Sequence, residues 1–432
     1  MKICVIGTGY VGLVTGACFS DLGNKVVCVD KNKTKIENLK KGVIPIYEPG
    51  LQELVTKNYK ANRLSFAKDL KEATSNSDVV FICVGTPTKK NSFSADLSQV
   101  YKVTREIRKY IKKFKVIVMK STVPVTTGEE IEKIILQKKS KKLFSVISNP
   151  EFLREGEALR DFMFPDRVVI GTNNTKANNI MKNLYDPIIK KGTKYLNTSR
   201  RGAELIKYAS NAFLATKISY INEIANLCEK TKVNVEDVSI GMGLDQRIGS
   251  RFLRPGPAYG GSCFPKDTRA LLATGKKFNT NLSIIKSTVK SNELRHKILS
   301  IKIKKLLKNK IKNKRITFLG VTFKPNTDDI RESSSLKLIP LLHKSGALIS
   351  YYDPSGEKIN FKKYKNVSFK NKISDACKNS DLIILHTEWN EFKNLNFKKL
   401  VKKRNFIVYD LRNIYSHKKM INNNINYFGI GR

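Results

Sequence analysis

Residues 3–12 read ICVIGTGYVG, an apolar run followed by three glycines in a G-x-G-x-x-G arrangement. The pattern predicts a short buried strand, a glycine turn and a helix that continues to about Leu22. The glycines permit the tight turn and let a pyrophosphate approach the amino terminus of the helix. A second apolar strand over residues 25–29 ends on Asp30, about 20 residues after the turn. These features predict the first βαβ unit of a dinucleotide-binding domain.

Asp30 indicates which dinucleotide this domain prefers. A carboxylate at the end of the second strand accepts hydrogen bonds from both ribose hydroxyls and repels the 2′-phosphate of NADP. A glycine-rich turn without a ligand is the alternative. We predict NAD as the cofactor, bound by residues of the turn, by the acid and by a nearby lysine that can reach the same ribose: Gly7, Gly9, Tyr10, Val11, Gly12, Asp30 and Lys35.

Further apolar strands are predicted over residues 78–84, 115–119 and 144–148. The loops after the first two carry Thr86 and Thr122, which would meet the cofactor at the carboxyl ends of parallel strands. Helix capping is the alternative role for both threonines.

The loop after the third strand carries Glu151 and Glu155, four residues apart. On a helix the two glutamates would share a face, where like charges need a ligand, a cation or water to offset their repulsion. This need favours a functional role for the pair.

Residues 200–231 contain no proline and a strong helical pattern, which predicts one long helix between two domains. Lys207 and Asn211 share a face of this helix, although a snorkelling lysine and a surface asparagine would show the same spacing. Two more helical segments are expected between Asp267 and about Lys314. A second α/β unit begins at residues 315–320, and its first turn lacks the three-glycine fingerprint. We therefore expect it to bind something other than a dinucleotide.

Residues 259–267 read YGGSCFPKD and place a cysteine, Cys263, after two glycines. If a helix begins there, the thiol lies at its positive amino-terminal end, where a thiolate is stabilised. A buried cysteine in a turn is the alternative. The preceding segment, residues 241–257, carries Arg247, Arg251 and Arg254 in a glycine- and proline-containing stretch suited to anions.

The composition is that of an intracellular globular protein with an unusual charge. The 432 residues carry a net charge of +44 and seven cysteines, an odd number that argues against a disulfide framework. Lysines occur throughout the chain, and the densest runs, 102–115 and 297–315, resemble solvated helix faces. We expect a cytoplasmic protein with no nucleic-acid partner, no membrane partner and no metal site.

Five ordered motifs give the chain a close resemblance to the UDP-glucose/GDP-mannose dehydrogenase family, from Met1 to about Asp410. They are Gly7–Gly12, Ser121–Pro124, Asn149–Gly156, Gly260–Asp267 and Gly320–Ser333, and small departures occur at Ala258 and Tyr259.

The resemblance implies that a nucleotide sugar is oxidised twice at C6, with two NAD⁺ reduced per turnover. It implies that the residues 149–164 and 256–267 belong to the branch that acts on UDP-glucose and forms UDP-glucuronate, with GDP-mannose or a UDP-N-acetylhexosamine as alternative substrates.

The resemblance also assigns roles. Cys263 would hold the aldehyde as a thiohemiacetal and then a thioester. Lys207 and Asn211 would stabilise the oxyanion, Asp267 and Thr122 would hold water, and Glu151 would act as the base. Further cofactor contacts would come from Thr86, Thr122, Glu155, Lys266 and Arg331. The substrate would contact Glu151, Phe152, Leu153, Arg154, Glu155, Lys207, Asn211, Arg247 (of a neighbouring subunit), Phe252, Leu253, Gly256, Tyr259, Gly260 and Lys324.

The expected fold is α/β, with two Rossmann-like doubly wound domains joined by a long central helix. We expect an NAD-binding domain over residues 1–199, a central helical domain for dimerisation over 200–300 and a UDP-sugar-binding domain over 301–432, in a homodimer or higher homo-oligomer. A 6-phosphogluconate-type or 3-hydroxyacid dehydrogenase would share this architecture but needs no thiol. A basic nucleotide- or nucleic-acid-binding module would need neither the thiol nor the Lys207 and Glu151 pair.

Overall fold

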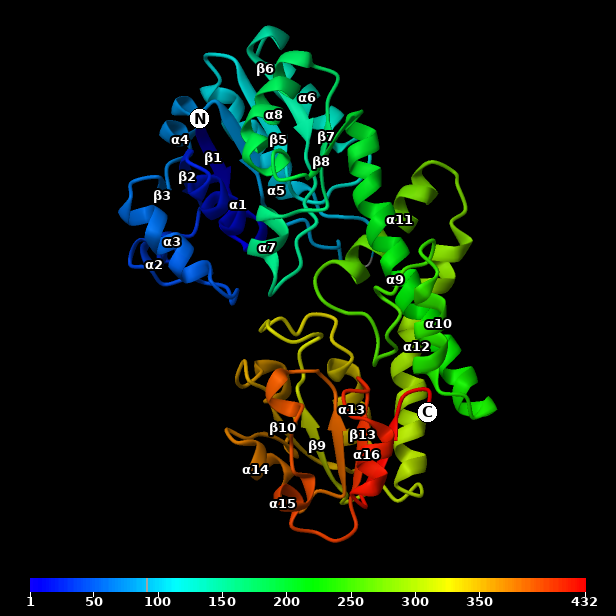
Figure 1. Ribbon diagram of the computed structural model, residues 1–432. Helices are drawn as coiled ribbons and strands as arrows, with labels where there is room; N and C mark the ends of the chain where they lie inside the picture. Colours follow the sequence, from blue (N-terminus) through cyan, green and yellow to red (C-terminus); the bar gives the residue numbers. More distant parts are fainter. Residues whose placement is uncertain (91) are drawn as a thin grey trace. The chain divides into compact units, whose positions relative to one another are not determined.

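The computed structural model describes residues 1–90 and 92–432, which divide into two compact units (Figure 1). Unit 1 comprises Met1–Ser210 and Arg269–Thr280, and unit 2 comprises Asn211–Thr268 and Asn281–Arg432. Helix α9 (Arg200–Thr231) contributes residues to both units, as does α11 (Phe264–Lys277). The single long helix predicted from the proline-free run is confirmed with the expected bounds.

Unit 1 is built on an eight-stranded sheet in the order β3-β2-β1-β4-β5-β6-β7-β8. The first six strands run parallel in the dinucleotide-binding order, so the strand order reverses between β1 and β4. Only the contact between β6 and β7 is antiparallel among the strands described. The strands are β1 (Lys2–Ile6), β2 (Lys25–Val29), β3 (Leu64–Ala67), β4 (Val79–Ile82), β5 (Lys115–Met119), β6 (Phe144–Ser148), β7 (Arg167–Gly171) and β8 (Lys194–Thr198).

Helices cover both faces of this sheet, which explains the continuous apolar run of β1. Val5 packs into the core under α1, α3, α7 and α8, whereas Cys4 and Ile6 pack into the core under α4, α5 and α6. The helices of unit 1 are α1 (Tyr10–Asp21), α2 (Lys33–Lys40), α3 (Leu51–Lys60), α4 (Leu70–Asn76), α5 (Ser98–Ile107), η1 (Arg108–Tyr110), α6 (Thr127–Leu136), η2 (Lys141–Leu143), α7 (Ala158–Met163) and α8 (Thr175–Ile189).

Unit 2 contains a six-stranded, fully parallel sheet in the order β11-β10-β9-β12-β13-β14. This is the same 3-2-1-4-5-6 order, reversing between β9 and β12. The strands are β9 (Arg315–Leu319), β10 (Leu348–Tyr352), β11 (Val367–Phe369), β12 (Leu382–Leu385), β13 (Ile407–Asp410) and β14 (Asn426–Gly429). One face packs against α9, α12 (Ser283–Leu306) and α13 (Ser335–Lys344), and the other against α14 (Ile373–Cys377), α15 (Phe397–Val401) and α16 (His417–Asn422). The remaining helices are α10 (Val235–Leu244), η3 (Ile359–Phe361) and η4 (Asn390–Phe392).

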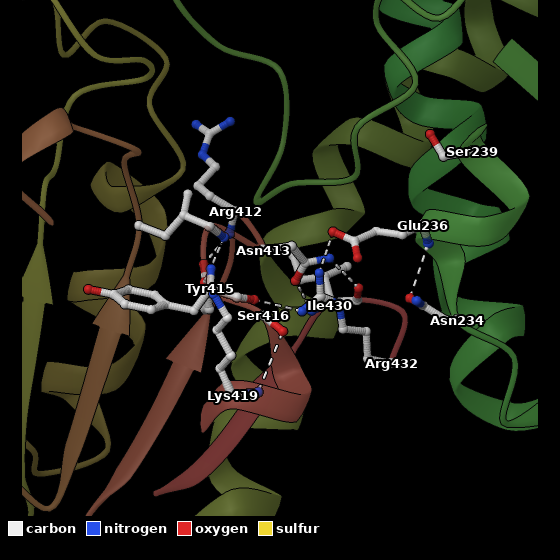
Figure 2. Close-up of polar contacts among 12 residues, drawn as sticks. Asn234, Glu236, Ser239, Arg412, Asn413, Tyr415, Ser416, Lys419, Ile430 and Arg432 are labelled. Carbon is white, nitrogen blue, oxygen red and sulfur yellow. Dashed lines mark hydrogen bonds and ion pairs between the residues drawn. The ribbon is translucent and has the colours of Figure 1, made fainter. Parts of the chain in front are cut away.

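Figure 2 shows how the last residues of unit 2 fasten its sheet to its helices. The Asn413 side chain donates to the Ile430 carbonyl and accepts from the Ile430 amide, both at 2.9 Å. Arg432 forms an ion pair with Glu236 of α10 and donates to the Tyr415 carbonyl at 2.9 Å. The segment after β14 therefore bridges the loop after β13 and helix α10.

The predicted fold class is confirmed. Five strands were not anticipated: β3, β7, β8, β11 and β14. Strands β8 (KYLNT) and β11 (VSF) offer little hydrophobic contrast, whereas the apolar run of β7 (RVVIG) was missed despite its burial. Helix α12 ends at Leu306 and not near Lys314. Lys115 is fully buried, so the prediction that the run 102–115 is a solvated face is wrong at that residue. Its ammonium group donates to the carbonyls of Ser75 and Ser77.

Among the described residues, none of the helices combines the length and the apolar character needed to span a membrane.

Candidate active site

The glycine turn after β1 has the geometry that a dinucleotide needs. Gly7 has φ +97°, and a Cβ on Gly12 would lie 1.8 Å from the Gly7 carbonyl oxygen, so both positions require glycine. Gly9 borders open space, and in the part of the chain described no side chain caps the start of α1 at Tyr10 and Val11. The amide groups of the first helical turn are therefore available to a phosphate, and the residues fit the pyrophosphate of NAD.

Asp30 lies beside this turn and is held as an anion. Its Oδ2 accepts from the Thr8 amide at 3.0 Å and the Thr8 hydroxyl at 2.8 Å, and its Oδ1 accepts from the Asn32 amide at 3.1 Å. Burial raises the pKa of Asp30, but these hydrogen bonds and Lys35, whose Nζ lies 3.6 Å away, hold it below its ordinary value. A carboxylate offers about four acceptor sites, so capacity remains for ribose hydroxyls.

The acid at the corresponding place in unit 2, Asp353, has a different role. It is 1% exposed, and its Oδ2 accepts from the amides of Val321 and Thr322 at 2.7 and 3.3 Å. The carboxylate is thus used to fix the first turn of the second sheet. A single glycine, Gly320, occupies that turn, where a Cβ would meet Thr387 at 2.5 Å.

Glu48 joins the glycine turn to the loop after β6 and was not anticipated from the sequence. It is 7% exposed and accepts from the amides of Gly156 and Ala158 at 2.6 and 2.8 Å and from the Tyr10 hydroxyl. The Tyr10 oxygen also accepts from the Gly156 amide at 2.7 Å. The only local signal for this role was the turn sequence YEPG at residues 47–50.

The polar loops after β4 and β5 contact each other at the carboxyl ends of these adjacent parallel strands. The Thr86 hydroxyl donates to the Thr122 carbonyl at 2.9 Å. Thr86 is nearly buried and Thr122 is partly exposed. The hydroxyl of Thr86 is thereby used to hold the Thr122 loop.

Glu151 and Lys207 form a buried ion pair in unit 1, with side chains 7% and 4% exposed. The Lys207 ammonium donates to the Glu151 Oε1 at 3.1 Å and to the Glu151 carbonyl at 2.5 Å. The Phe152 ring lies 5.2 Å from the same ammonium, and Glu151 Oε2 accepts from the Leu153 amide at 2.6 Å. A cation and a carboxylate held in contact out of water are suited to proton transfer or to stabilising a developing charge.

The expectation that Glu151 and Glu155 share a helical face is wrong. Helix α7 begins only at Ala158, so both glutamates lie in the loop before it. Arg154 of this loop is committed to Asp161, to which it donates at 2.6 and 2.9 Å. The residues before α7 therefore form a loop held by ion pairs, and Lys207 provides the cation that Glu151 needs.

Asp267 is the centre of a second polar cluster, in unit 2. It is fully buried, and its carboxylate accepts from Asn211 at 2.6 Å and from Lys266 at 2.5 Å. Cys263 directly precedes α11, as the glycine-to-helix pattern predicted, and its carbonyl accepts from the Asp267 amide at 2.8 Å. Asn211 follows Lys207 by one turn of α9.

Cys263 differs from the other cysteines in its exposure. It is partly exposed, whereas Cys4, Cys18, Cys28, Cys83, Cys228 and Cys377 are buried. Burial raises the pKa of the Cys4, Cys83 and Cys377 thiols to about 12 and that of Cys18 and Cys28 as well. A thiol reaction on the native chain is therefore expected at Cys263.

The two glycines before Cys263 serve close packing within unit 2. A Cβ on Gly260 would lie 2.6 Å from the Glu332 carbonyl oxygen, and one on Gly261 would lie 2.7 Å from the Phe323 ring. The Gly261 amide donates to the Arg331 carbonyl at 2.8 Å. The cysteine loop is therefore docked on the loop after β9.

That loop presents the cations predicted from the sequence. Arg331 is exposed and donates to Asp329 at 2.8 and 2.9 Å, and Lys324 is partly exposed with its ammonium 5.7 Å from the Phe323 ring. Both belong to the loop after β9, at the point where the strand order reverses.

The segment 252–259, before Cys263, has a strained backbone at one residue and is fixed by hydrogen bonds and burial. Phe252 has φ +66°, which is rare for a bulky residue, and its ring lies 6.1 Å from that of Phe264. Leu253 is 2% exposed, and the amides of Gly256 and Tyr259 donate to side-chain oxygens of Asn222 and Asn292 at 2.8 and 2.9 Å. Arg247 stands apart from this set, because it is exposed and bonded to Asp245.

Two sheets with the dinucleotide strand order, one three-glycine turn with its acid and a partly exposed thiol at a helix start define an NAD-linked dehydrogenase of the doubly wound class. The family models match along most of the chain: the NAD binding domain at residues 1–189, the central domain at 201–294 and the UDP binding domain at 317–417. The chain belongs to the UDP-glucose/GDP-mannose dehydrogenase family.

Individual relatives are similar over their full length. The UDP-glucose 6-dehydrogenase of Rhizobium meliloti (strain 1021) is 47% identical, with all of both chains covered. Among solved structures, a UDP-glucose dehydrogenase from Pyrobaculum islandicum has a TM-score of 0.91 at 34% identity, covering 99% of this chain and 97% of that one. A UDP-D-ManNAc dehydrogenase from Pyrococcus horikoshii has a TM-score of 0.87 at 26% identity, covering 100% and 99%.

Proposed function

We propose that this protein oxidises UDP-glucose to UDP-glucuronate in two NAD-dependent steps at C6. The observation that carries the proposal is Cys263, the one partly exposed thiol among the described residues, which directly precedes α11 and lies four residues before the buried Asp267. A single oxidation of an alcohol needs no thiol, whereas oxidation through to an acid gains from one.

The proposed chemistry balances with NAD as the only oxidant. With NAD⁺ held by the glycine turn and Asp30, the cofactor would accept a hydride from C6 while a base takes the hydroxyl proton, which would leave an aldehyde. The Cys263 thiolate would add to this aldehyde to give the anion of a thiohemiacetal, and loss of a second hydride to a second NAD⁺ would leave a thioester. Water then attacks the thioester and releases the carboxylate and the thiol.

The side chains take roles that suit their surroundings. Lys207 and Asn211 stabilise the developing oxyanion, and Glu151 takes up protons. Asp267 and Thr122 hold water. NAD supplies the hydride acceptor, held by the glycine turn and Asp30. The substrate and cofactor contacts expected from the sequence, and the three domains at 1–199, 200–300 and 301–432, are part of this proposal.

UDP-glucose is preferred over the alternatives because the curated relatives with 40–47% identity carry that name. GDP-mannose and a UDP-N-acetylhexosamine are the alternative substrates within the family. The UDP-D-ManNAc dehydrogenase of similar fold is less similar in sequence, at 26% identity.

The test is NADH formation across a panel of UDP- and GDP-sugars, with the stoichiometry measured at completion. We expect two NADH per UDP-glucose and a kcat/KM at least about tenfold above that of any other sugar, about 1.4 kcal/mol in transition-state stabilisation. Equal or better activity with GDP-mannose would refute the substrate assignment, and one NADH per sugar would refute the double oxidation.

The proposal includes a homodimer in the cytoplasm. Phe213, Tyr220 and Leu227 are spaced by seven residues along α9 and are 64%, 48% and 58% exposed, so they form an apolar stripe on one face of the helix. A second copy of the same stripe is the proposed cover. The six buried cysteines, none of them in a disulfide, agree with a reducing compartment.

A further inference from the structure

Lys120 is a buried cation that the proposed chemistry does not use. It directly follows β5, and it is 4% exposed. Its ammonium group donates to the Asn149 Oδ1 and to the Tyr185 hydroxyl, both at 3.1 Å. It lies 5.7 Å from the centre of the Tyr185 ring and 5.9 Å from that of Phe162. Among the residues the structure describes, no carboxylate lies within 4 Å of this charge, although a buried ammonium group ordinarily needs a counter-ion.

The hydrogen bonds of Lys120 lead to the loop that carries Glu151. Asn149 follows β6 directly, and its Oδ1 also accepts from the Tyr185 hydroxyl at 2.7 Å. The Asn149 Nδ2 donates to the Val169 carbonyl at 2.9 Å, and its amide donates to the Met119 carbonyl at 2.9 Å. The side-chain oxygen, the side-chain nitrogen and the backbone amide of Asn149 are therefore all hydrogen-bonded. Glu151 follows Asn149 by only two residues.

The titratable groups around Lys120 come from four other elements. Cys83 follows β4, Glu151 follows β6, Tyr185 lies on α8 and Lys207 lies on α9. Burial lowers the pKa of Lys120 to about 8, while Cys83 and Glu151 favour its charged form and Lys207 opposes it. Lys207 thus contacts the Glu151 carboxylate directly, whereas Lys120 is a second buried cation that acts on it from more than 4 Å away.

We propose that Lys120 is a positioning residue, which fixes the Glu151 loop through Asn149 and places a second positive charge near the Glu151–Lys207 pair. The inference rests on the proposed function for the roles of that pair. This role differs from a packing role, because a nearby charge makes protonation of both members of the pair easier or harder together.

The variant Lys120→Met keeps the length of the side chain and removes its charge. Loss of a positive charge makes both the carboxylate and the ammonium of the pair easier to protonate, so both limbs of the pH profile of kcat move to higher pH, by about 0.5 unit or more. We expect kcat to fall at least about tenfold at neutral pH, with the KM for UDP-glucose and the NAD Kd within about twofold. A merely structural loosening of the pair would move the two limbs toward each other. A weaker ion pair makes the carboxylate easier to protonate and the ammonium easier to deprotonate.

Lys115 provides the matched control, since it lies at the other end of β5, is fully buried, and its ammonium group donates to the Ser75 and Ser77 carbonyls. Burial lowers its pKa to about 8 as well. Lys115→Met should lower stability while leaving both limbs in place. If Lys120→Met does not fold, Asn149→Asp keeps the acceptor oxygen and neutralises the charge of Lys120, and it should move both limbs upward.

A measurement that does not need activity separates this inference from the proposed function. In protein carrying ¹³C at the Glu side-chain carboxyl, the Glu151 signal is assigned by its loss in Glu151→Gln and titrated by NMR. We expect its midpoint to move to higher pH in Lys120→Met and to stay in place in Lys115→Met. An unmoved midpoint in Lys120→Met, or an equal movement in the control, overturns the inference. Absence of activity of the wild type toward every nucleotide sugar overturns only the proposed function.

Discussion

At the residue scale, Asp30 and Asp353 occupy equivalent places in the two sheets but differ in exposure and in the hydrogen bonds that they accept. Both follow the second strand of a doubly wound sheet, and both accept from the turn after the first strand. Asp30 is less buried and has acceptor capacity to spare, whereas Asp353 is 1% exposed and is used by its own turn. Exposure therefore distinguishes Asp30, which we propose contacts the ribose, from Asp353, which supports its own turn.

Replacing Asp30 with Asn should weaken NAD binding and ease the entry of NADP. The amide no longer repels a 2′-phosphate and accepts fewer hydrogen bonds from the ribose hydroxyls. We expect the ratio of kcat/KM for NAD to that for NADP to fall at least about tenfold.

Asp353→Asn is the matched control for cofactor choice. It should lower stability and leave the ratio of the two cofactors unchanged. If the wild type already uses both cofactors equally well, Asp30 does not contact the ribose.

The residues predicted from the sequence are those whose signal is local. The glycine turn with Asp30 and the turn with Cys263 each lie within a short stretch whose residue types carry the meaning. Glu48 and Lys120 were missed because their partners are distant in sequence: Glu48 bonds to an amide 108 residues away, and Lys120 to a hydroxyl 65 residues away. The fold brings these residues and their partners together, and their spacing in the sequence does not indicate the contacts.

At the scale of elements, helix α6 begins without a cap of its own. Thr126 precedes it with φ +85°, and its side chain makes no capping hydrogen bond to the helix. The cap comes from α9: the Glu204 carboxylate accepts from the amides of Thr126 and Gly128 at 2.9 and 2.8 Å and from the Ser148 hydroxyl at 3.0 Å. A carboxylate from another helix thus satisfies the first amides of α6.

Glu204 should make stability depend on pH. Burial raises its pKa to about 7 from 4.5, although the donors from Gly128, Ser148 and Thr126 oppose the shift. A raised pKa means that the folded state binds the proton more tightly, so this contribution is full below pH 4.5 and is lost as the pH rises through 7. One pKa unit corresponds to about 1.4 kcal/mol, so the stability difference between wild type and Glu204→Gln should fall by roughly 2 to 3 kcal/mol over that window.

Urea unfolding of both proteins at several pH values between 4.5 and 8 measures this difference. Parallel stability curves for the two proteins would show that Glu204 has an ordinary titration. Glu53, on the exposed part of α3, offers a control substitution that should leave the slope unchanged.

Elements were predictable where burial was two-sided. The apolar runs of β1, β4, β5 and β6 and the uninterrupted pattern of α9 gave their positions, because a parallel strand buried on both faces has few polar residues. Strand β8, read KYLNT, is half polar and lies at the edge of its sheet, where one row of side chains meets water. Such strands carry too little contrast to be recognised from their own residues.

At the scale of the whole molecule, the stripe of Phe213, Tyr220 and Leu227 predicts the oligomeric state. We expect the wild type to sediment as two chains of 49.0 kDa, and Phe213→Glu combined with Leu227→Glu to sediment as one. Buried charges without partners are costly, so two glutamates in the seam should separate the copies. Ile359→Glu is the control, since Ile359 is 81% exposed on η3 and lies outside the stripe. A wild type that sediments as one chain at micromolar concentration would contradict the dimer.

The burial of six of the described cysteines leaves Cys263 as the single thiol that a reagent in solution can reach in the native chain. A maleimide fluorophore added to the folded protein should therefore attach once per chain, at Cys263, and the label should be absent from Cys263→Ala. Because buried thiols with a raised pKa react only after the cores open, the appearance of further labels on heating or in urea reports unfolding, core by core. Cys263 thus provides a site for an optical probe in the folded state, and the labelling rate of the six buried cysteines measures how fast that state is lost.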